Sequence, residues 1–260
     1  MTTYQLRLVV IQTLVVGYAL TFGARVLAAL NTPKLLVLAT ESDPLGEPVC
    51  EDGTLSAGVD LSSHQQIPNW NKITQVFVSF AFIKATEGVT FKSPRFDIDW
   101  QGAKTAGSFR SAYHFFMPGD DAAEQAKFFL ATVGRLDNND LPMMLDLETK
   151  QNVKPELIVS AARTWLQIVE ANTGKKPIIY TSAKFWKSLG SPAGFEQYPL
   201  FIVDLTSSCP VTPLPWHKWT FWQHAIGSTP GVNGSVDLDV FNGAIPNLLA
   251  LTQGQDTGLF

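Results

Sequence analysis

The sequence predicts an α/β fold, a modified (β/α)8 barrel with a β-rich closing half, on three observations. Eight short apolar runs follow one another after residue 56. Helix-length segments separate the first five runs, and shorter connections rich in proline and glycine separate the later ones. The chain has 260 residues, 45% of them hydrophobic and 16% charged. This is enough for one large domain of roughly 200 residues and an extension.

The first segment of the chain is apolar. Residues 8–24 carry no charge and lie between Arg7 and Arg25. The run is close to the lower limit of about 17 residues for a membrane span. Three interpretations stay open: a signal peptide cleaved near residues 26–28, an uncleaved signal anchor that contacts the membrane, and a helix packed inside an assembly. We expect this apolar helix within residues 1–30.

Residues 31–55 predict a linker, because proline, glycine and acidic residues are frequent there. We expect the folded domain over residues 56–250 and a tail over residues 251–260. Cys50, near the end of the linker, and Cys209 are the two cysteines of the chain. In an exported protein they can form a disulfide, and the alternative is two free thiols.

Each expected strand is a short apolar run bounded by turn-forming residues. In chain order, the expected strands are residues 58–61, 76–84, 111–115, 142–147, 177–180, 200–203, 219–223 and 236–240. Two segments, residues 120–133 and 155–173, have an apolar stripe with helical spacing. Pro155 opens the second helix in its first turn, where proline is well tolerated.

Two carboxylates, Asp146 and Glu148, lie at the end of the fourth expected strand. Alternate side chains of a strand share a face, so these two point the same way with Cα atoms about 6.5–7 Å apart. Two carboxyl groups this close cannot both ionise freely, and the pair can hold a protonated acid beside a charged carboxylate. Glycoside hydrolysis needs such a combination. The same spacing also occurs at solvated strand ends, so the pair alone does not establish a catalytic site.

Further acidic residues recur at the strand ends where barrels form their active sites. Asp60 ends the first expected strand and Asp237 lies in the last. With Asp146 and Glu148, they can bring four carboxylates from three segments together, which favours an enzyme. A net charge of -4 without a lysine or arginine run argues against nucleic-acid binding. Four histidines and two cysteines without metal-ligand spacing predict no metal site.

Several motifs occur in order over residues 58–243. They are Gly58-Val59-Asp60-Leu61-Ser62, Ile83-Lys84-Ala85-Thr86-Glu87-Gly88, Ala112-Tyr113-His114-Phe115, Leu145-Asp146-Leu147-Glu148, Trp222-Gln223 and Val236-Asp237-Leu238-Asp239-Val240-Phe241. Together these motifs resemble glycoside hydrolase family 25, the Chalaropsis-type lysozymes or N-acetylmuramidases, and the chain is similar to a phage endolysin of this family.

The resemblance implies cleavage of the β-1,4 bond between N-acetylmuramic acid and N-acetylglucosamine in peptidoglycan. Carried over to this sequence, Glu148 is the general acid and later the base. Asp146 either stabilises an intermediate formed by the acetamido group of the substrate or assists directly. Asp60 and Asp237 orient the sugar and tune the pKa of the pair. No metal or organic cofactor is implied.

Five more residues are expected to support or contact the glycan: Glu87, Tyr113, Tyr180, Gln223 and Trp222. The alternatives are a solvated turn acid for Glu87 and a core position for the tryptophan. Asp239 shares a strand face with Asp237, and we expect Asp237 to act in the site. Residues 90–92 and 203–206 depart from the family pattern, which leaves the preference for modified peptidoglycan open.

We expect a monomeric, exported bacteriolytic enzyme, either periplasmic or held at the inner membrane by residues 8–24. Phage-type host lysis is the favoured role. The alternatives are a virion component that carries the same wall-degrading barrel, and a barrel that binds glycan without cleaving it.

Overall fold

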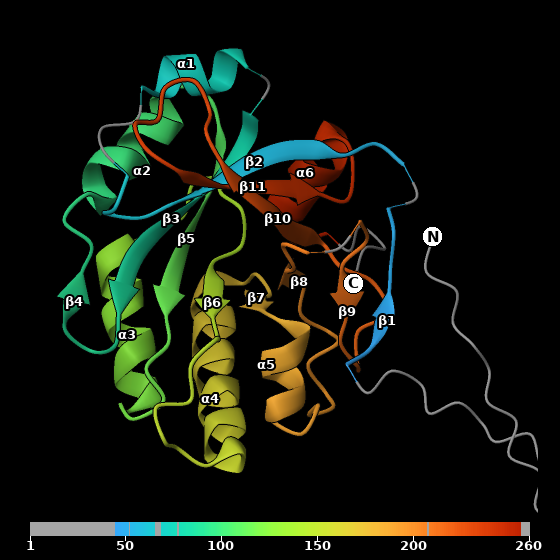
Figure 1. The fold of residues 1–260 in the computed structure, drawn as a ribbon. Coiled ribbons are helices and arrows are strands. Elements are labelled where there is room, and N and C mark those ends of the chain that lie inside the picture. The colour runs from blue at the N-terminus through green and yellow to red at the C-terminus, as the bar shows by residue number, and fades with distance from the viewer. Residues whose placement is uncertain (1–44, 52, 66–68, 77, 207, 256–260) are drawn as a thin grey trace, which may run out of the picture. The chain divides into compact units, whose positions relative to one another are not determined.

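The computed structural model describes residues 45–51, 53–65, 69–76, 78–206 and 208–255 (Figure 1). The expected apolar helix, most of the expected linker and the end of the expected tail lie outside these residues. No helix in this part of the chain is long and apolar enough to cross a lipid bilayer.

Eight strands of the described chain form a closed barrel, and all eight coincide with strands expected from the sequence. They are β2 (Ser56–Leu61), β3 (Val78–Glu87), β5 (Phe109–Phe115), β6 (Met144–Asp146), β7 (Ile178–Thr181), β8 (Leu200–Val203), β10 (Phe221–Gly227) and β11 (Val236–Phe241). The barrel closes because β2 pairs with both β3 and β11. The short strand β4 (Phe91–Lys92) extends the sheet from β3.

The direction of the strands decides which residues meet. The barrel strands β2, β3, β5, β6, β7, β8 and β10 run parallel to one another, whereas β11 runs antiparallel to both of its neighbours. The carboxyl ends of the parallel strands therefore form one end of the barrel, which we call the mouth, and β11 begins there. Because of this reversal, Asp237 at the start of β11 lies opposite Asp60 near the end of β2.

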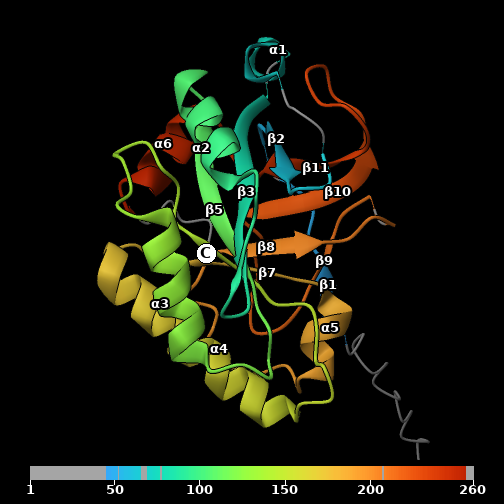
Figure 2. The same cartoon turned by 90° about the vertical axis from the view of Figure 1, so that its left-hand side faces the viewer.

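Both helices expected from their apolar stripes are present, as α3 (Ala122–Val133) and α4 (Pro155–Thr173). Asp121 caps α3 by accepting a hydrogen bond from the backbone N–H of Glu124 at 2.9 Å. The two helices lie side by side outside the barrel (Figure 2). Shorter helices of the described chain are α1 (Trp70–Gln75), α2 (Phe96–Thr105), α5 (Ala183–Ser188) and α6 (Ile245–Thr252).

Aromatic side chains fill the barrel below the mouth. Five phenylalanines from four strands make edge-on or tilted contacts, with ring centroids 4.9 to 5.9 Å apart. They are Phe80, Phe82, Phe201, Phe221 and Phe241. Leu248 and Leu251 of α6 belong to the same cluster and cover its lower end. The strands that hold this apolar core carry polar residues nearer the mouth.

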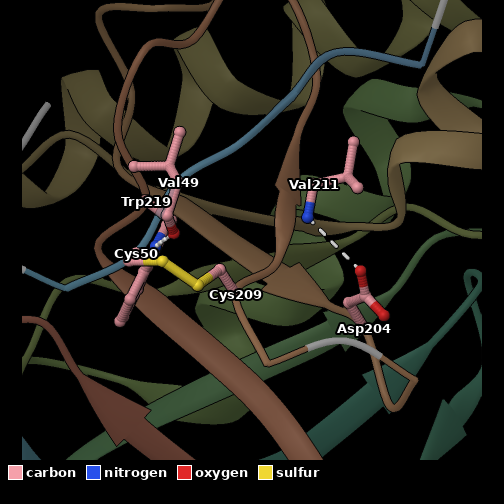
Figure 3. Close-up of a disulfide and its surroundings, with 6 residues drawn as sticks. All are labelled: Val49, Cys50, Asp204, Cys209, Val211 and Trp219. Atoms are coloured by element: carbon pink, nitrogen blue, oxygen red, sulfur yellow. Dashed lines mark hydrogen bonds between the residues drawn. A yellow bond between two sulfur atoms is a disulfide. The ribbon is translucent and has the colours of Figure 1, made fainter. Parts of the chain in front are cut away.

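Residues 47–50 form a strap that is attached to the barrel (Figure 3). In it, β1 (Glu47–Pro48) pairs antiparallel with β9 (Val211–Thr212). The indole N–H of Trp219 donates to the carbonyl of Val49 at 2.7 Å. The expected disulfide between Cys50 and Cys209 is present. The end of the expected linker is therefore part of the folded unit.

Candidate active site

The four carboxylates expected from the sequence meet at the barrel mouth. Asp60 and Asp146 are buried near the ends of β2 and β6. Glu148 is exposed to solvent, and Asp237 is half-buried. The charges of Asp237 and Glu148 act on Asp60, and those of Glu148 and Asp60 act on Asp146. Residues from three distant segments thus form one acidic cluster.

The local backbone explains how Asp146 and Glu148 share this cluster. Beyond the last residue of β6, the N–H of Leu147 donates to the carbonyl of Tyr180 at 2.9 Å. The extended chain places Glu148 on the same face as Asp146. Asp146 lies opposite Phe115 and Tyr180 in the sheet, and Glu148 follows at the rim. The pair combines one buried and one solvent-accessible carboxyl group.

Burial and neighbouring charges change the pKa values of these groups. Burial raises the pKa of Asp60 well above its ordinary value, and the charge of Asp237 adds to the increase. Burial likewise raises the pKa of Asp146, with contributions from the charges of Glu148 and Asp60. Partial burial raises the pKa of Glu148, and the positive charge of Lys84 opposes this increase. Protonated and ionised carboxyl groups can therefore coexist at the mouth.

Lys84 supplies a cation at the mouth that was missed among the expected site residues. Its Nζ lies 2.7 Å from Oε2 of Glu87. Glu87, expected to support the site, is thus the ion-pair partner of Lys84. Alternation along β3 puts Lys84 on the same face as Phe80 and Phe82, which lie inside the barrel. This alternation is the sequence signal that could have identified Lys84.

Tyr113, Tyr180 and Gln223 form a polar layer that borders the aromatic core. The hydroxyl of Tyr180 donates to Oε1 of Gln223 at 2.9 Å, and the hydroxyl of Tyr113 interacts with the carboxyl group of Asp60. Burial raises the pKa of both phenols. They therefore remain neutral hydrogen-bond donors. The structure brings all three expected residues to the carboxylate cluster.

Asp239 is a further carboxyl group inside the barrel. It is only 1% exposed, and neither carboxyl oxygen has a hydrogen-bond partner among the described residues. Burial, followed by the charges of Asp60 and Asp237, raises its pKa well above the ordinary value. Of the two acids on β11, Asp237 is therefore the more accessible to a substrate.

Trp222 does not lie with the carboxylates. It packs in the apolar layer outside the barrel together with Trp216 and Trp219. Its indole N–H donates to the carbonyl of Asp204 at 2.8 Å. Because Gln223 faces the interior, its strand neighbour Trp222 must face outward. This position does not support the expected contact between Trp222 and the glycan.

A family model described as glycosyl hydrolases family 25 matches residues 59–232, more than half of the chain. The chain belongs to this family. The matched segment contains Asp60, Asp146 and Glu148 and ends shortly before Asp237.

Three similarities illustrate the relationship. The chain is 37% identical over 204 residues to the uncharacterized protein YegX of Escherichia coli K12, covering 76% of this chain and 73% of YegX. It is 36% identical over 206 residues to Lysozyme M1 of Streptomyces globisporus, covering 75% of this chain and 70% of Lysozyme M1. The crystal structure of the lysozyme from Streptomyces coelicolor superposes with a TM-score of 0.75 at 33% identity, covering 79% of this chain and all 100% of that one. The protein is a lysozyme-type glycosidase.

Proposed function

We propose that the barrel hydrolyses the β-1,4 bond between N-acetylmuramic acid and N-acetylglucosamine in peptidoglycan, with Glu148 as the general acid. The observation that carries this assignment is the contrast within the carboxyl pair. Glu148 is exposed at the rim, where a glycan strand can reach it, whereas Asp146 is buried beside it. The raised pKa of Glu148 favours the protonated form that a general acid needs.

In the proposed reaction, Glu148 donates its proton to the glycosidic oxygen as the bond to the anomeric carbon breaks. The departing sugar leaves as an alcohol, and the carboxylate of Glu148 then accepts a proton from the attacking water. This returns Glu148 to its starting state.

Asp146 is proposed to interact with the acetamido group of the substrate. Its Oδ1 has no hydrogen-bond partner among the described residues, so it can accept from the acetamido N–H. As the acetamido oxygen attacks the anomeric carbon, positive charge develops on that group and favours ionised Asp146. Asp60 and Asp237 are proposed to orient the sugar. Tyr113, Tyr180 and Gln223 form the inner end of the site, next to the aromatic core.

Digestion of purified peptidoglycan tests this assignment. Wild type is expected to release fragments with muramic acid at the new reducing ends, identified by mass spectrometry. Glu148→Gln is expected to lose about 10²- to 10⁴-fold in rate, because the amide cannot donate the proton. Glu124→Gln, an exposed surface acid on α3, serves as the control and keeps full activity. Undiminished hydrolysis by Glu148→Gln would remove the central assignment.

We also propose that the catalytic barrel, residues 56–250, acts after export and serves phage-type host lysis, with residues 8–24 as signal anchor. A disulfide between Cys50 and Cys209 fits an oxidising compartment. An uncharged run between two arginines fits an export signal. Cell fractionation before and after membrane depolarisation tests this: a membrane-bound protein is expected to become soluble. A protein found in purified virions instead would indicate a virion component.

A further inference from the structure

The position of Lys84 is fixed from several directions. Its Nζ pairs with Glu87 Oε2 at 2.7 Å, and the side chain of Lys84 is only 15% exposed. The same atom lies 4.7 Å from the ring centroid of Phe115 and 5.7 Å from that of Phe91, within the range of cation–π attraction. A flexible side chain is thereby held at one place beside the carboxylate cluster.

The charge of Lys84 acts on several groups of the mouth at once. It favours the ionised forms of Asp60, Asp146 and Glu148, and it disfavours protonation of the buried His114 behind the strand. The other titratable groups around the cluster are acids and phenols: Glu87, Asp237, Asp239, Tyr113 and Tyr180. Burial raises the pKa values of Asp60, Asp146, Asp237 and Asp239. The charge of Lys84 opposes this increase at Asp60 and Asp146 and so favours their ionised forms.

We propose that Lys84, held by Glu87, is a positioning residue that keeps the buried carboxyl group of Asp146 able to ionise during the reaction. The proposal rests on the proposed function of Glu148 and Asp146. Without the cation, an ionised Asp146 faces only like charges in a poorly solvated site, and its proton is harder to remove. The sugar would then lose the anionic partner that the developing positive charge requires.

The test compares the pH profiles of kcat/KM for wild type, Lys84→Met and Lys84→Arg, with solubilised peptidoglycan as substrate. The charge of Lys84 favours ionised Asp146, so its removal raises the carboxyl pKa of Asp146. The acidic limb of the Lys84→Met profile should therefore move to higher pH, with a loss of kcat/KM at pH values below the shifted limb. Lys84→Arg retains the charge and should keep the wild-type profile.

Lys127→Met is the matched control, because Lys127 forms an exposed ion pair with Glu124 on α3, outside the barrel. Its profile should equal that of wild type. A Lys84→Met profile with the wild-type limb would overturn the proposal, and so would an equal shift in Lys84→Arg. Should Lys84→Met fail to fold, Lys84→Gln replaces it, and failure of both would assign Lys84 to stability alone. Activity in Glu148→Gln would instead refute the proposed function, so the two failures are distinguishable.

Discussion

Two carboxyl groups on one strand, Asp237 and Asp239, show how burial separates residues of the same type. Both lie on the inner face of β11, yet Asp237 is half-buried and Asp239 is 1% exposed. A buried carboxyl group without a hydrogen-bond partner is expensive to ionise. Asp239 therefore holds a proton at a pH where an ordinary aspartate is charged, and it imposes a pH-dependent cost on the fold.

Asp239→Asn is expected to remove this cost. The pKa of Asp239 is higher in the folded chain than in the unfolded chain, so the unfolded chain releases its proton first as the pH rises. Stability therefore decreases with rising pH until the folded-state pKa is passed. The gain in Tm of Asp239→Asn over wild type should grow by a few degrees between pH 4 and pH 8. Asp97→Asn, at an exposed position, should show no such trend, and a pH-independent difference for Asp239→Asn would contradict the prediction.

At the residue scale, the sequence predicts which acids converge because strand ends and alternation are readable without coordinates. It places Asp60, Asp146, Glu148 and Asp237 at one mouth, as found. Alternation also accounts for the outward position of Trp222, since adjacent strand residues cannot both face the interior. The ion pair of Lys84 and the burial of Asp239 depend on side-chain packing, which the sequence pattern does not contain.

At the scale of elements, the strap and the segment after β8 support each other. Asp204, the first residue after β8, donates its backbone N–H to the carbonyl of Gln223 at 3.2 Å. Its Oδ2 accepts from the N–H of Val211 at 3.3 Å (Figure 3). Val211 follows Cys209 by two residues and belongs to β9, which pairs with β1 of the strap. The disulfide therefore connects the strap to a segment bonded to the strand that carries Gln223.

Loss of this disulfide is expected to destabilise the barrel. The two cysteines are 159 residues apart in sequence, and a native disulfide typically contributes about 2–4 kcal/mol. The double variant Cys50→Ser/Cys209→Ser should lose this much in urea unfolding at neutral pH. Dithiothreitol should lower the stability of wild type to the same level and leave the variant unchanged. Equal stability of oxidised wild type and variant would show that the strap holds through its other contacts.

The elements themselves differ in how well the sequence predicts them. The barrel strands are apolar runs, and α3 and α4 are long enough to show a stripe, so their pattern is local. The helices α1 and α5 have six residues each, too few for a periodic signal. The strands β1 and β9 have two residues each and pair across most of the chain. Only the folded barrel brings them together.

At the scale of the whole molecule, closure of the barrel depends on how closely β2 and β3 approach. Gly58 of β2 faces the interior, and a Cβ at this position would overlap the ring of Phe80. That ring contacts Phe82 and Phe221 with centroids 5.9 and 5.2 Å away. The aromatic core leaves no room for a side chain at this point, two residues below Asp60.

Gly58→Ala is therefore expected to destabilise the whole barrel by about 1–3 kcal/mol, because the Phe80 ring must shift against its packed neighbours. Gly53→Ala is the matched control: a Cβ there has open space around it, and the change should stay within about 0.5 kcal/mol. Urea unfolding of the two variants measures the difference. Since Gly58 precedes Asp60 on the same face of β2, the displaced strand should also lower kcat more than Gly53→Ala does. Equal stability of the two variants would mean that the core accommodates the methyl group without moving the mouth.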